Sequence, residues 1–201
     1  MTIKIRFARP EDAASVLAIY GPYCDSTTVS FEIAAPTSAQ MSQRIERIML
    51  QHAWIVGEID RELAGYVYAS QHRERAAYRW MVDVAVYVSP AHRRRNLGKA
   101  LYSALFEILR AQGYFKAFAG ITLPNAASVR LHESVGFRPI AVYEGVGYKL
   151  GQWLDVGWWQ LDLQPEINNP PEPWPFGEIQ NSLAQAIFRD AERLIKPALL
   201  E

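Results

Sequence analysis

The chain has little of what marks secreted and membrane proteins. Only one of its 201 residues is a cysteine, Cys24, so no internal disulfide can form. No apolar run reaches the roughly 20 residues of a transmembrane helix, and the first residues, MTIKIRFARPED, lack the apolar stretch of a signal peptide. These absences predict a cytoplasmic protein with no membrane partner.

Net charge is lacking as well. Lysine and arginine number 21, aspartate and glutamate number 21, and the formal net charge is zero. A neutral chain sets up no broad field that attracts polyanions, so we expect no nucleic-acid partner. Histidine, cysteine and carboxylate residues do not cluster at metal-ligand spacings either, so we expect no metal. Any anion site must therefore be local.

Half of the residues are hydrophobic, which is enough for one sizeable core. Their spacing alternates between strand and helix periods, which predicts a mixed α/β fold. Strands are expected at residues 2–8, 54–59, 63–70, 81–88, 114–121, 138–148 and 153–163. Asp60 and Arg61 should form the turn of a hairpin between the second and third strands. Helices are expected from Val16 to Tyr23, from a capping box at Thr37, over Leu97–Leu109 with a left-handed cap at Gly113, and from Asn125, a turn or N-cap residue, to Val135.

The composition changes after Leu163, where NNPPEPWPF forms a proline-rich segment that cannot join a sheet. A terminal helix should follow, with one apolar side formed by Ile179, Leu183, Ile187 and Leu194. We therefore divide the chain into a domain at 1–165 and an extension at 166–201. The apolar side can pack on its own subunit, lie across a dimer, or bind a partner as an interaction module.

The densest positive charge lies in SPAHRRRNLGKALYSAL, residues 89–105, at the expected start of a helix. The first amides of a helix have no intrahelical partners and form the positive end of its dipole. Gly98 lets a ligand approach the backbone, and asparagine at position 96 tolerates a left-handed turn. This pattern is typical of a phosphate site, although a solvated basic run is the alternative.

The segment VAVYVSPAHRRRNLGKALY resembles the acetyl-CoA pyrophosphate loop of the GNAT N-acetyltransferases, with Asn96 where the family has a first glycine. Four further segments resemble the phosphinothricin and methionine sulfoximine acetyltransferase subgroup: STTVSFE, RERAAYRW, TLPNAASVRLHESVGF and GYKLGQWLDVGWWQLDL. The resemblance covers about residues 2–165. It implies a GNAT fold, a twisted mixed sheet flanked by helices, and acetyl-CoA as cosubstrate.

The resemblance also implies which residues bind acetyl-CoA. The strand before the loop would pair its backbone with the pantetheine arm, Asn125 would hydrogen-bond to the same arm, and the loop would hold the pyrophosphate. The cofactor-binding residues expected on this basis are Val86, Tyr87, Val88, Arg93, Arg94, Arg95, Asn96, Leu97, Gly98, Lys99 and Asn125.

Acetylation requires a neutral amine, so a base must remove a proton. Asp83, an ionisable residue within MVDVAVYV, matches the catalytic glutamate of the subgroup. Because aspartate is one methylene shorter, we expect a relay through an ordered water; the alternative is an outward-facing carboxylate paired with an arginine. His132 matches the subgroup histidine and is the candidate acid for the thiolate, although it could instead be a structural histidine.

For the acceptor, Arg75 resembles the subgroup arginine that faces a substrate carboxylate, and Arg73 would assist it. Phe31 and Tyr78 match residues near the acceptor pocket. The predicted reaction transfers acetyl to the primary amine of a small amino-acid-like acceptor. Two alternatives stay open: another amine, such as an amino acid, a polyamine or a peptide N-terminus, and a non-catalytic acetyl-CoA sensor. The subgroup also implies a homodimer.

Overall fold

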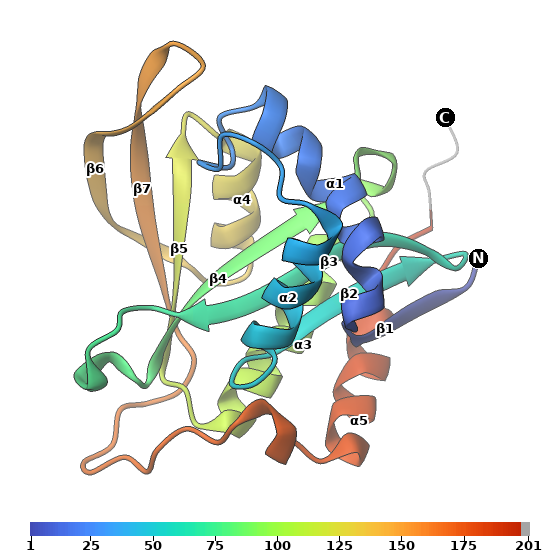
Figure 1. Cartoon of the computed structure of the whole chain (residues 1–201). Coiled ribbons are helices and arrows are strands. Elements are labelled where there is room, and N and C mark those ends of the chain that lie inside the picture. The colour runs from blue at the N-terminus through green and yellow to red at the C-terminus, as the bar shows by residue number, and fades with distance from the viewer. Residues whose placement is uncertain (198–201) are drawn as a thin grey trace.

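A computed structural model describes residues 1–197, which form one twisted sheet with helices on both faces (Figure 1). The strands are β1 (Ile3–Phe7), β2 (Trp54–Ile59), β3 (Glu62–Gln71), β4 (Met81–Val88), β5 (Lys116–Leu123), β6 (Arg138–Lys149) and β7 (Gln152–Asp162). The α-helices are α1 (Ala13–Ser26), α2 (Ser38–Ile48), α3 (Leu97–Gln112), α4 (Ala126–Ser134) and α5 (Asn181–Glu192). Short 3-10 turns are η1 (Pro10–Asp12), η2 (Ala76–Tyr78), η3 (Pro90–His92) and η4 (Phe176–Glu178).

The sheet order is β1-β2-β3-β4-β5-β7-β6, and the β4–β5 pair is parallel while the other pairs are antiparallel. The mixed α/β fold predicted from the sequence is therefore confirmed. The predicted hairpin at Asp60 and Arg61 is also present, with both residues at positive φ. Within residues 1–197, no helix is both long enough and apolar enough to cross a membrane.

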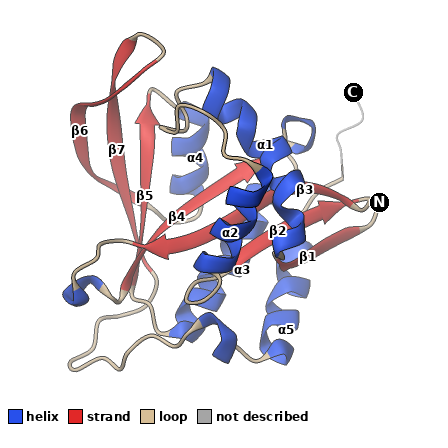
Figure 2. Cartoon of the chain, in the orientation of Figure 1, coloured by secondary structure: helices blue, strands red, loops and turns tan. Residues whose placement is uncertain are grey.

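Helices α1 and α2 cover one face of the β2–β4 half, while no helix lies in front of β5, β7 and β6 in this view (Figure 2). The core beneath them includes Val16, Met41, Ile45, Trp54 and Tyr66. Helix α2 begins as predicted, because the Thr37 hydroxyl accepts from Gln40 N and the Gln40 side chain accepts from Thr37 N.

Helix α3 packs tightly on the opposite face because two strand glycines let it approach. A Cβ at Gly57 would lie 2.9 Å from Leu97 Cδ1, and one at Gly65 would lie 3.2 Å from Leu97 Cδ2. The helix ends as predicted at Gly113, which has a φ of 91° and is left-handed. This packing fixes the N-terminus of α3 beside the end of β4.

Helix α5 lies on α3 and beside β1, so it packs on its own subunit. Its buried residues are Ala184, Phe188 and Ala191. The predicted apolar side is wrong at Leu183 and Leu194, which are exposed. Leu194 lies beyond the end of α5, and the face of the helix that is buried carries Ala184, Phe188 and Ala191 in place of Leu183.

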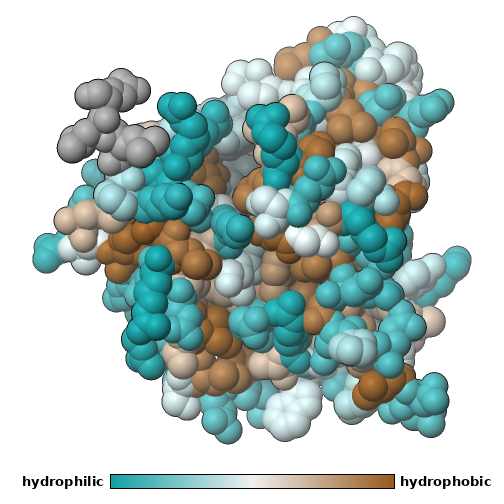
Figure 3. All heavy atoms as spheres, turned by 180° about the vertical axis from the view of Figure 1, so that it is seen from behind, coloured by the Kyte–Doolittle hydropathy of each residue, from teal (hydrophilic) through white to brown (hydrophobic). Residues whose placement is uncertain are grey.

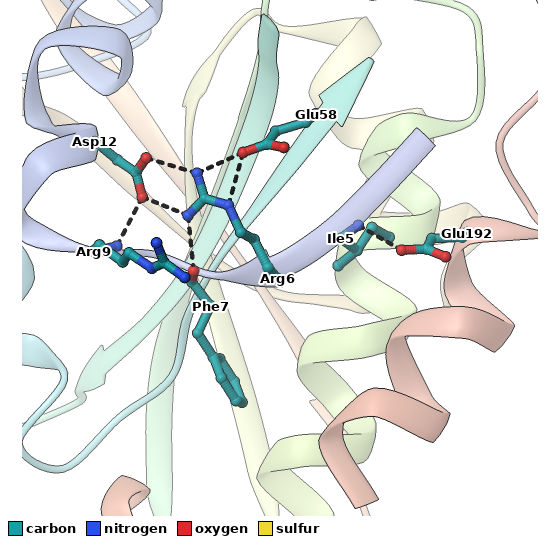
Figure 4. A network of polar contacts seen from close by, with 7 residues as sticks. All are labelled: Ile5, Arg6, Phe7, Arg9, Asp12, Glu58 and Glu192. Carbon is teal, nitrogen blue, oxygen red and sulfur yellow. Dashed lines mark hydrogen bonds and ion pairs between the residues drawn. The ribbon is translucent and has the colours of Figure 1, made fainter. Parts of the chain in front are cut away.

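Polar contacts hold β1 in place at the edge of the sheet (Figure 4). The Arg6 guanidinium binds Asp12 at 2.7 Å and Glu58 at 2.7 Å. On the outer edge, Ile5 N donates to Glu192 Oε1 of α5 at 2.7 Å. A carboxylate from the last helix thus satisfies an edge amide that would otherwise be open to another strand.

Strands β4 and β5 separate partway along their length. Their pairing covers only Met81, Val82 and Asp83 of β4, although β4 continues to Val88. Figure 1 shows the two strands joined at one end and diverging toward the other. The remainder of β4 is paired with β3 on one side only, from Val84 to Val88. The opening between the strands is the place where a ligand can lie against free backbone.

Candidate functional site

The divergence of β4 and β5 opens into a groove of about 600 Å³, which we call the β4–α3 groove. Of the residues predicted to bind the cofactor, ten line it: Val86, Tyr87, Val88, Arg93, Arg94, Asn96, Leu97, Gly98, Lys99 and Asn125. Further lining residues that the sequence analysis did not identify include Tyr23, Thr27, His92, Ser128 and Arg130. All of them except Tyr23 lie within the segments quoted for the family resemblance, but the pattern did not single them out as individual residues.

The N-terminus of α3 forms one end of the groove and is uncapped. Asn96 is left-handed, as predicted, with φ 61° and ψ 10°, and its side chain makes no capping hydrogen bond. Arg94 is also left-handed, with φ 60°. The amides of Leu97, Gly98 and Lys99 therefore have no side-chain cap, and these residues line the groove together with Arg93 and Arg94.

One buried polar atom in the groove lacks a partner within the described residues. His92 Nδ1 is enclosed and makes no hydrogen bond. Nearby, Arg93 donates to Tyr23 Oη at 2.8 Å, and Tyr23 Oη lies 3.3 Å from Val88 O. A buried nitrogen without a partner costs free energy.

Arg95, predicted as a cofactor residue, does not line the groove. Its Nε donates to Lys196 O at 3.2 Å, and its own carbonyl accepts from Lys196 N at 2.9 Å. The left-handed residues on either side, Arg94 and Asn96, turn the chain so that Arg95 faces the C-terminal segment. Arg95 is therefore directed away from the groove, and the run of three arginines does not reveal which way each one points.

The free edge of β4 forms the side of the groove. Ser89 N donates to Ala64 O, so this amide faces β3. Amides alternate between the two edges of a strand, which directs those of Val88, Val86 and Val84 toward the open side. The geometry leaves a row of amides and carbonyls to which an extended ligand can bond as an added strand would.

Asp83 is the last residue of β4 that pairs with β5, so it lies where the two strands separate. Its Oδ1 is 2.6 Å from Nδ1 of His72, a residue just beyond β3 that the sequence analysis missed. Burial raises the pKa of the Asp83 carboxyl, and the hydrogen bond from His72 opposes this without cancelling it. His72 could not be found by spacing, because only the β3–β4 register, which pairs Ser70 with Asp83, brings it there.

His132 is buried, with 5% of its surface exposed, and both ring nitrogens have protein partners. Nδ1 lies 2.8 Å from Ser128 O, and Nε2 lies 2.7 Å from Tyr102 Oη. Burial lowers the pKa of His132, partly offset by the Ser128 hydrogen bond, so the neutral ring is favoured. The hydroxyl of Ser128, a residue that lines the groove, lies 3.3 Å from Nδ1.

Asn125 precedes α4 and caps it, since its Oδ1 accepts from Ser128 N at 3.1 Å. The helix-capping interpretation is therefore present in the structure. Its side-chain amide nitrogen has no partner among residues 1–197 and belongs to a residue that lines the groove. One side chain can thus cap α4 and contact a ligand at the same time.

The predicted acceptor residues divide into two groups. Arg73 lies with its guanidinium 5.7 Å from the centroid of Trp158, and Tyr78 lies 5.8 Å from the ring of His72. Phe31 instead packs on Gly147 of β6, where a Cβ would clash at 2.1 Å without a shift of the ring. Arg75 is exposed before η2, and its side chain makes no hydrogen bond or ion pair within residues 1–197.

Comparison with known proteins gives consistent results. A family model described as "Acetyltransferase (GNAT) domain" matches residues 5–158. The chain is 39% identical over 171 residues to a phosphinothricin N-acetyltransferase of Streptomyces viridochromogenes, a match covering 85% of this chain and 92% of that protein. It is 35% identical over 160 residues to an L-methionine sulfoximine/L-methionine sulfone acetyltransferase of Salmonella typhimurium, covering 79% of this chain and 94% of that protein.

One solved structure is similar to this chain over most of the length of both. It is a GNAT superfamily phosphinothricin acetyltransferase from Sinorhizobium meliloti in complex with AcCoA, with a TM-score of 0.81 and 32% sequence identity. The match covers 88% of this chain and 97% of that one. The similarity therefore extends over most of the fold rather than an isolated motif.

Proposed function

The chain belongs to the GNAT acetyltransferase family, and on this premise we propose that it transfers acetyl from acetyl-CoA to the primary amine of a small amino-acid-like acceptor of the phosphinothricin or methionine sulfoximine type. The observation that carries the proposal is the β4–α3 groove, which joins an uncapped helix N-terminus to the free edge of a strand. Relatives of 39% and 35% identity named for these two acceptors support the acceptor class.

Acetyl-CoA is proposed to lie along this groove as the cosubstrate. Its pyrophosphate would be held by the amides of Leu97, Gly98 and Lys99, with Arg93 and Arg94 adding charge. The pantetheine arm would pair with the free edge of β4 and with the Asn125 side chain. The thioester then lies toward the point where the strands separate, next to Asp83.

Catalysis requires loss of a proton from the amine, attack of nitrogen on the thioester carbonyl, and expulsion of the coenzyme A thiolate. Asp83 is proposed to serve the first step through a relay, because its carboxylate is short and already hydrogen-bonded to His72. His132 is proposed to assist the thiolate through the Ser128 hydroxyl, since the ring itself is buried. Polar groups arranged in advance at such positions stabilise charge as it develops.

The acceptor is proposed to enter from the face that carries Asp83, where no helix covers β5 and β7 (Figure 2). Arg73 and Tyr78 lie beside this entrance, and they are the first candidates to contact an acceptor carboxylate or backbone. Arg75 and Phe31 remain proposed contacts: Arg75 is unpaired within residues 1–197 and exposed, and the Phe31 ring is 41% exposed.

We also propose a cytoplasmic homodimer. The exposed apolar residues of the β6–β7 hairpin support the dimer, and in Figure 3 apolar surface gathers on the side where these strands lie. These residues are Ile140, Val142, Tyr143, Val146, Tyr148, Leu150 and Trp153. The buried free thiol of Cys24 is consistent with a reducing compartment.

Thiol release from acetyl-CoA tests the function. The wild type and Asp83→Asn would be assayed with phosphinothricin, methionine sulfoximine, common amino acids and polyamines. Rapid turnover of the first two acceptors, suppressed by the substitution, is expected. Preference for a polyamine would show that the acceptor is a polyamine and not an amino-acid-like compound. Binding of acetyl-CoA without turnover of any amine would favour a non-catalytic acetyl-CoA sensor.

A further inference from the structure

A histidine and a carboxylate meet at the point where β4 and β5 separate. His72 Nδ1 is 2.6 Å from Asp83 Oδ1. An ionised carboxylate can only accept, so Nδ1 carries the proton of the neutral ring and Nε2 keeps a free electron pair. Within residues 1–197, Nε2 has no hydrogen-bond partner and is not among the enclosed polar atoms, so it is open to a ligand.

Aromatic side chains fix the plane of this ring. His72 stacks on Phe118 of β5 with centroids 4.4 Å apart and 20° between the planes. Tyr78 and Trp158 approach it edge-on, at 5.8 Å and 6.4 Å. The side chain of His72 is 12% exposed. A rotation of the ring would break the stacking and the Asp83 hydrogen bond together, so its open nitrogen has a defined direction.

Phe118 is also the residue of β5 that pairs with Asp83, which places the three side chains at the apex of the opening. We propose that His72 is the catalytic base of the transferase and accepts the amine proton at Nε2, with Asp83 as the positioning residue that fixes its tautomer. This inference rests on the proposed function and deepens it, because it replaces a water relay by a named side chain.

The chemistry favours the imidazole over the carboxylate. An imidazole, with an ordinary pKa of about 6.5, is a better proton acceptor near neutral pH than an aspartate of about 3.9. Burial raises the pKa of Asp83, so the buried carboxylate gains from a positive neighbour. Such a neighbour forms when His72 takes the proton, and the shorter aspartate leaves room for the ring between it and the acceptor.

The proton and electron pairs balance without a further reagent. The ammonium group of the acceptor gives one proton to His72 Nε2, and its nitrogen pair then attacks the thioester carbonyl carbon. The carbon–sulfur bond breaks as the carbonyl re-forms, and the thiolate takes one proton. The nitrogen loses its second proton, so the products are the amide, free coenzyme A and one proton released to solvent.

The charged and titratable groups around His72 determine how the rate of the proposed reaction depends on pH. Asp83 faces it from β4, Tyr78 faces it from η2, and Arg73 follows it in the chain. The neighbours from β5 and β7, Phe118 and Trp158, carry no charge. Asp83 is therefore the charged group that hydrogen-bonds to the ring, and its replacement should change the acid limb of the rate profile.

Two variants separate the base from its positioning residue. His72→Asn keeps a nitrogen donor for Asp83 but has no basic atom, so kcat should fall by about 10²- to 10⁴-fold and the acid limb should vanish. Asp83→Asn removes the counter-charge, so activity should fall while the acid limb persists at lower pH. Acetyl-CoA affinity should not change in His72→Asn, and the matched variant His52→Asn, whose ring contacts Tyr114 and neither His72 nor Asp83, should retain wild-type kcat at about pH 8.

The opposite pattern, an acid limb kept by His72→Asn and lost in Asp83→Asn, overturns the proposal and makes Asp83 the base. A second measurement needs neither turnover nor a folded variant. In ¹⁵N spectra of the wild type at about pH 8, we expect the His72 proton on Nδ1; a proton on Nε2 would overturn the proposal. If the wild type acetylates none of the amines, the proposed function fails separately, and the spectrum still decides whether His72 has the tautomer of a base.

Discussion

His52 gives the chain a specific sensitivity to acid. It lies between α2 and β2, with 9% of its surface exposed, and its Nδ1 lies 3.0 Å from the hydroxyl of Tyr114. Burial lowers the pKa of His52 from its ordinary value of 6.5 to about 4. The folded state therefore holds the ring neutral at a pH where the unfolded chain already binds a proton.

The sign and size of the stability change follow from this difference in pKa between the folded and the unfolded chain. Stability linked to His52 is intact above about pH 6.5 and is lost progressively as the pH falls toward about 4, because only the unfolded state gains a proton in that window. At about 1.4 kcal/mol for each pKa unit, the full loss is about 3 kcal/mol. By about pH 4.5 most of it, about 2.5 kcal/mol, should be gone.

The perturbation is His52→Asn, which keeps an acceptor for the Tyr114 hydroxyl but cannot titrate. Urea unfolding followed by tryptophan fluorescence at about pH 7 and about pH 4.5 gives the free energy of unfolding of each protein. The loss on acidification should be about 2.5 kcal/mol smaller in the variant. Other acid-sensitive groups, such as His132 and Asp12, lose the same amount in both proteins, so they cancel in the difference. Equal losses in the two proteins would refute the reasoning.

Three further predictions concern the extension, the anion site and the leaving group. Phe188→Ala should lower the free energy of unfolding by about 3–5 kcal/mol in urea titrations, because this ring is buried between α5 and the sheet; a loss under about 1 kcal/mol would mean that α5 does not anchor the fold. Arg94→Ala should raise the KM for acetyl-CoA about 10- to 100-fold, while Arg95→Ala, whose side chain faces Lys196 O, should change it less than about twofold; similar effects would contradict the assigned directions. Ser128→Ala should lower kcat at least about tenfold with little change in KM if the hydroxyl links His132 to the groove, and an unchanged kcat would remove His132 from the mechanism.

Features that depend on a few neighbouring residues were predictable from the sequence. The left-handed turn at Asn96, the capping box at Thr37 and the left-handed cap at Gly113 are each determined by local backbone chemistry. The same is true of the β4 strand and of the groove residues that come directly from it or from the loop that follows. In these places, propensity and tertiary structure agree.

Features that depend on register or packing direction were not predictable. His72 meets Asp83 only because β3 and β4 pair in one register, and nothing in the spacing of the two residues indicates this. The direction of Arg95 depends on contacts with residues about a hundred positions away. Leu183 is exposed because the position of α5 is set by what α3 and β1 leave open, which the helical period alone does not contain.

The hydrogen bond from Ile5 to Glu192 joins the first strand to the last helix. Because β1 is synthesised before α5, the outer edge of the sheet stays without this cover until α5 has left the ribosome and docked. Until then the amide of Ile5 is open to another strand, so the docking of α5 also protects the folding chain against edge-to-edge association.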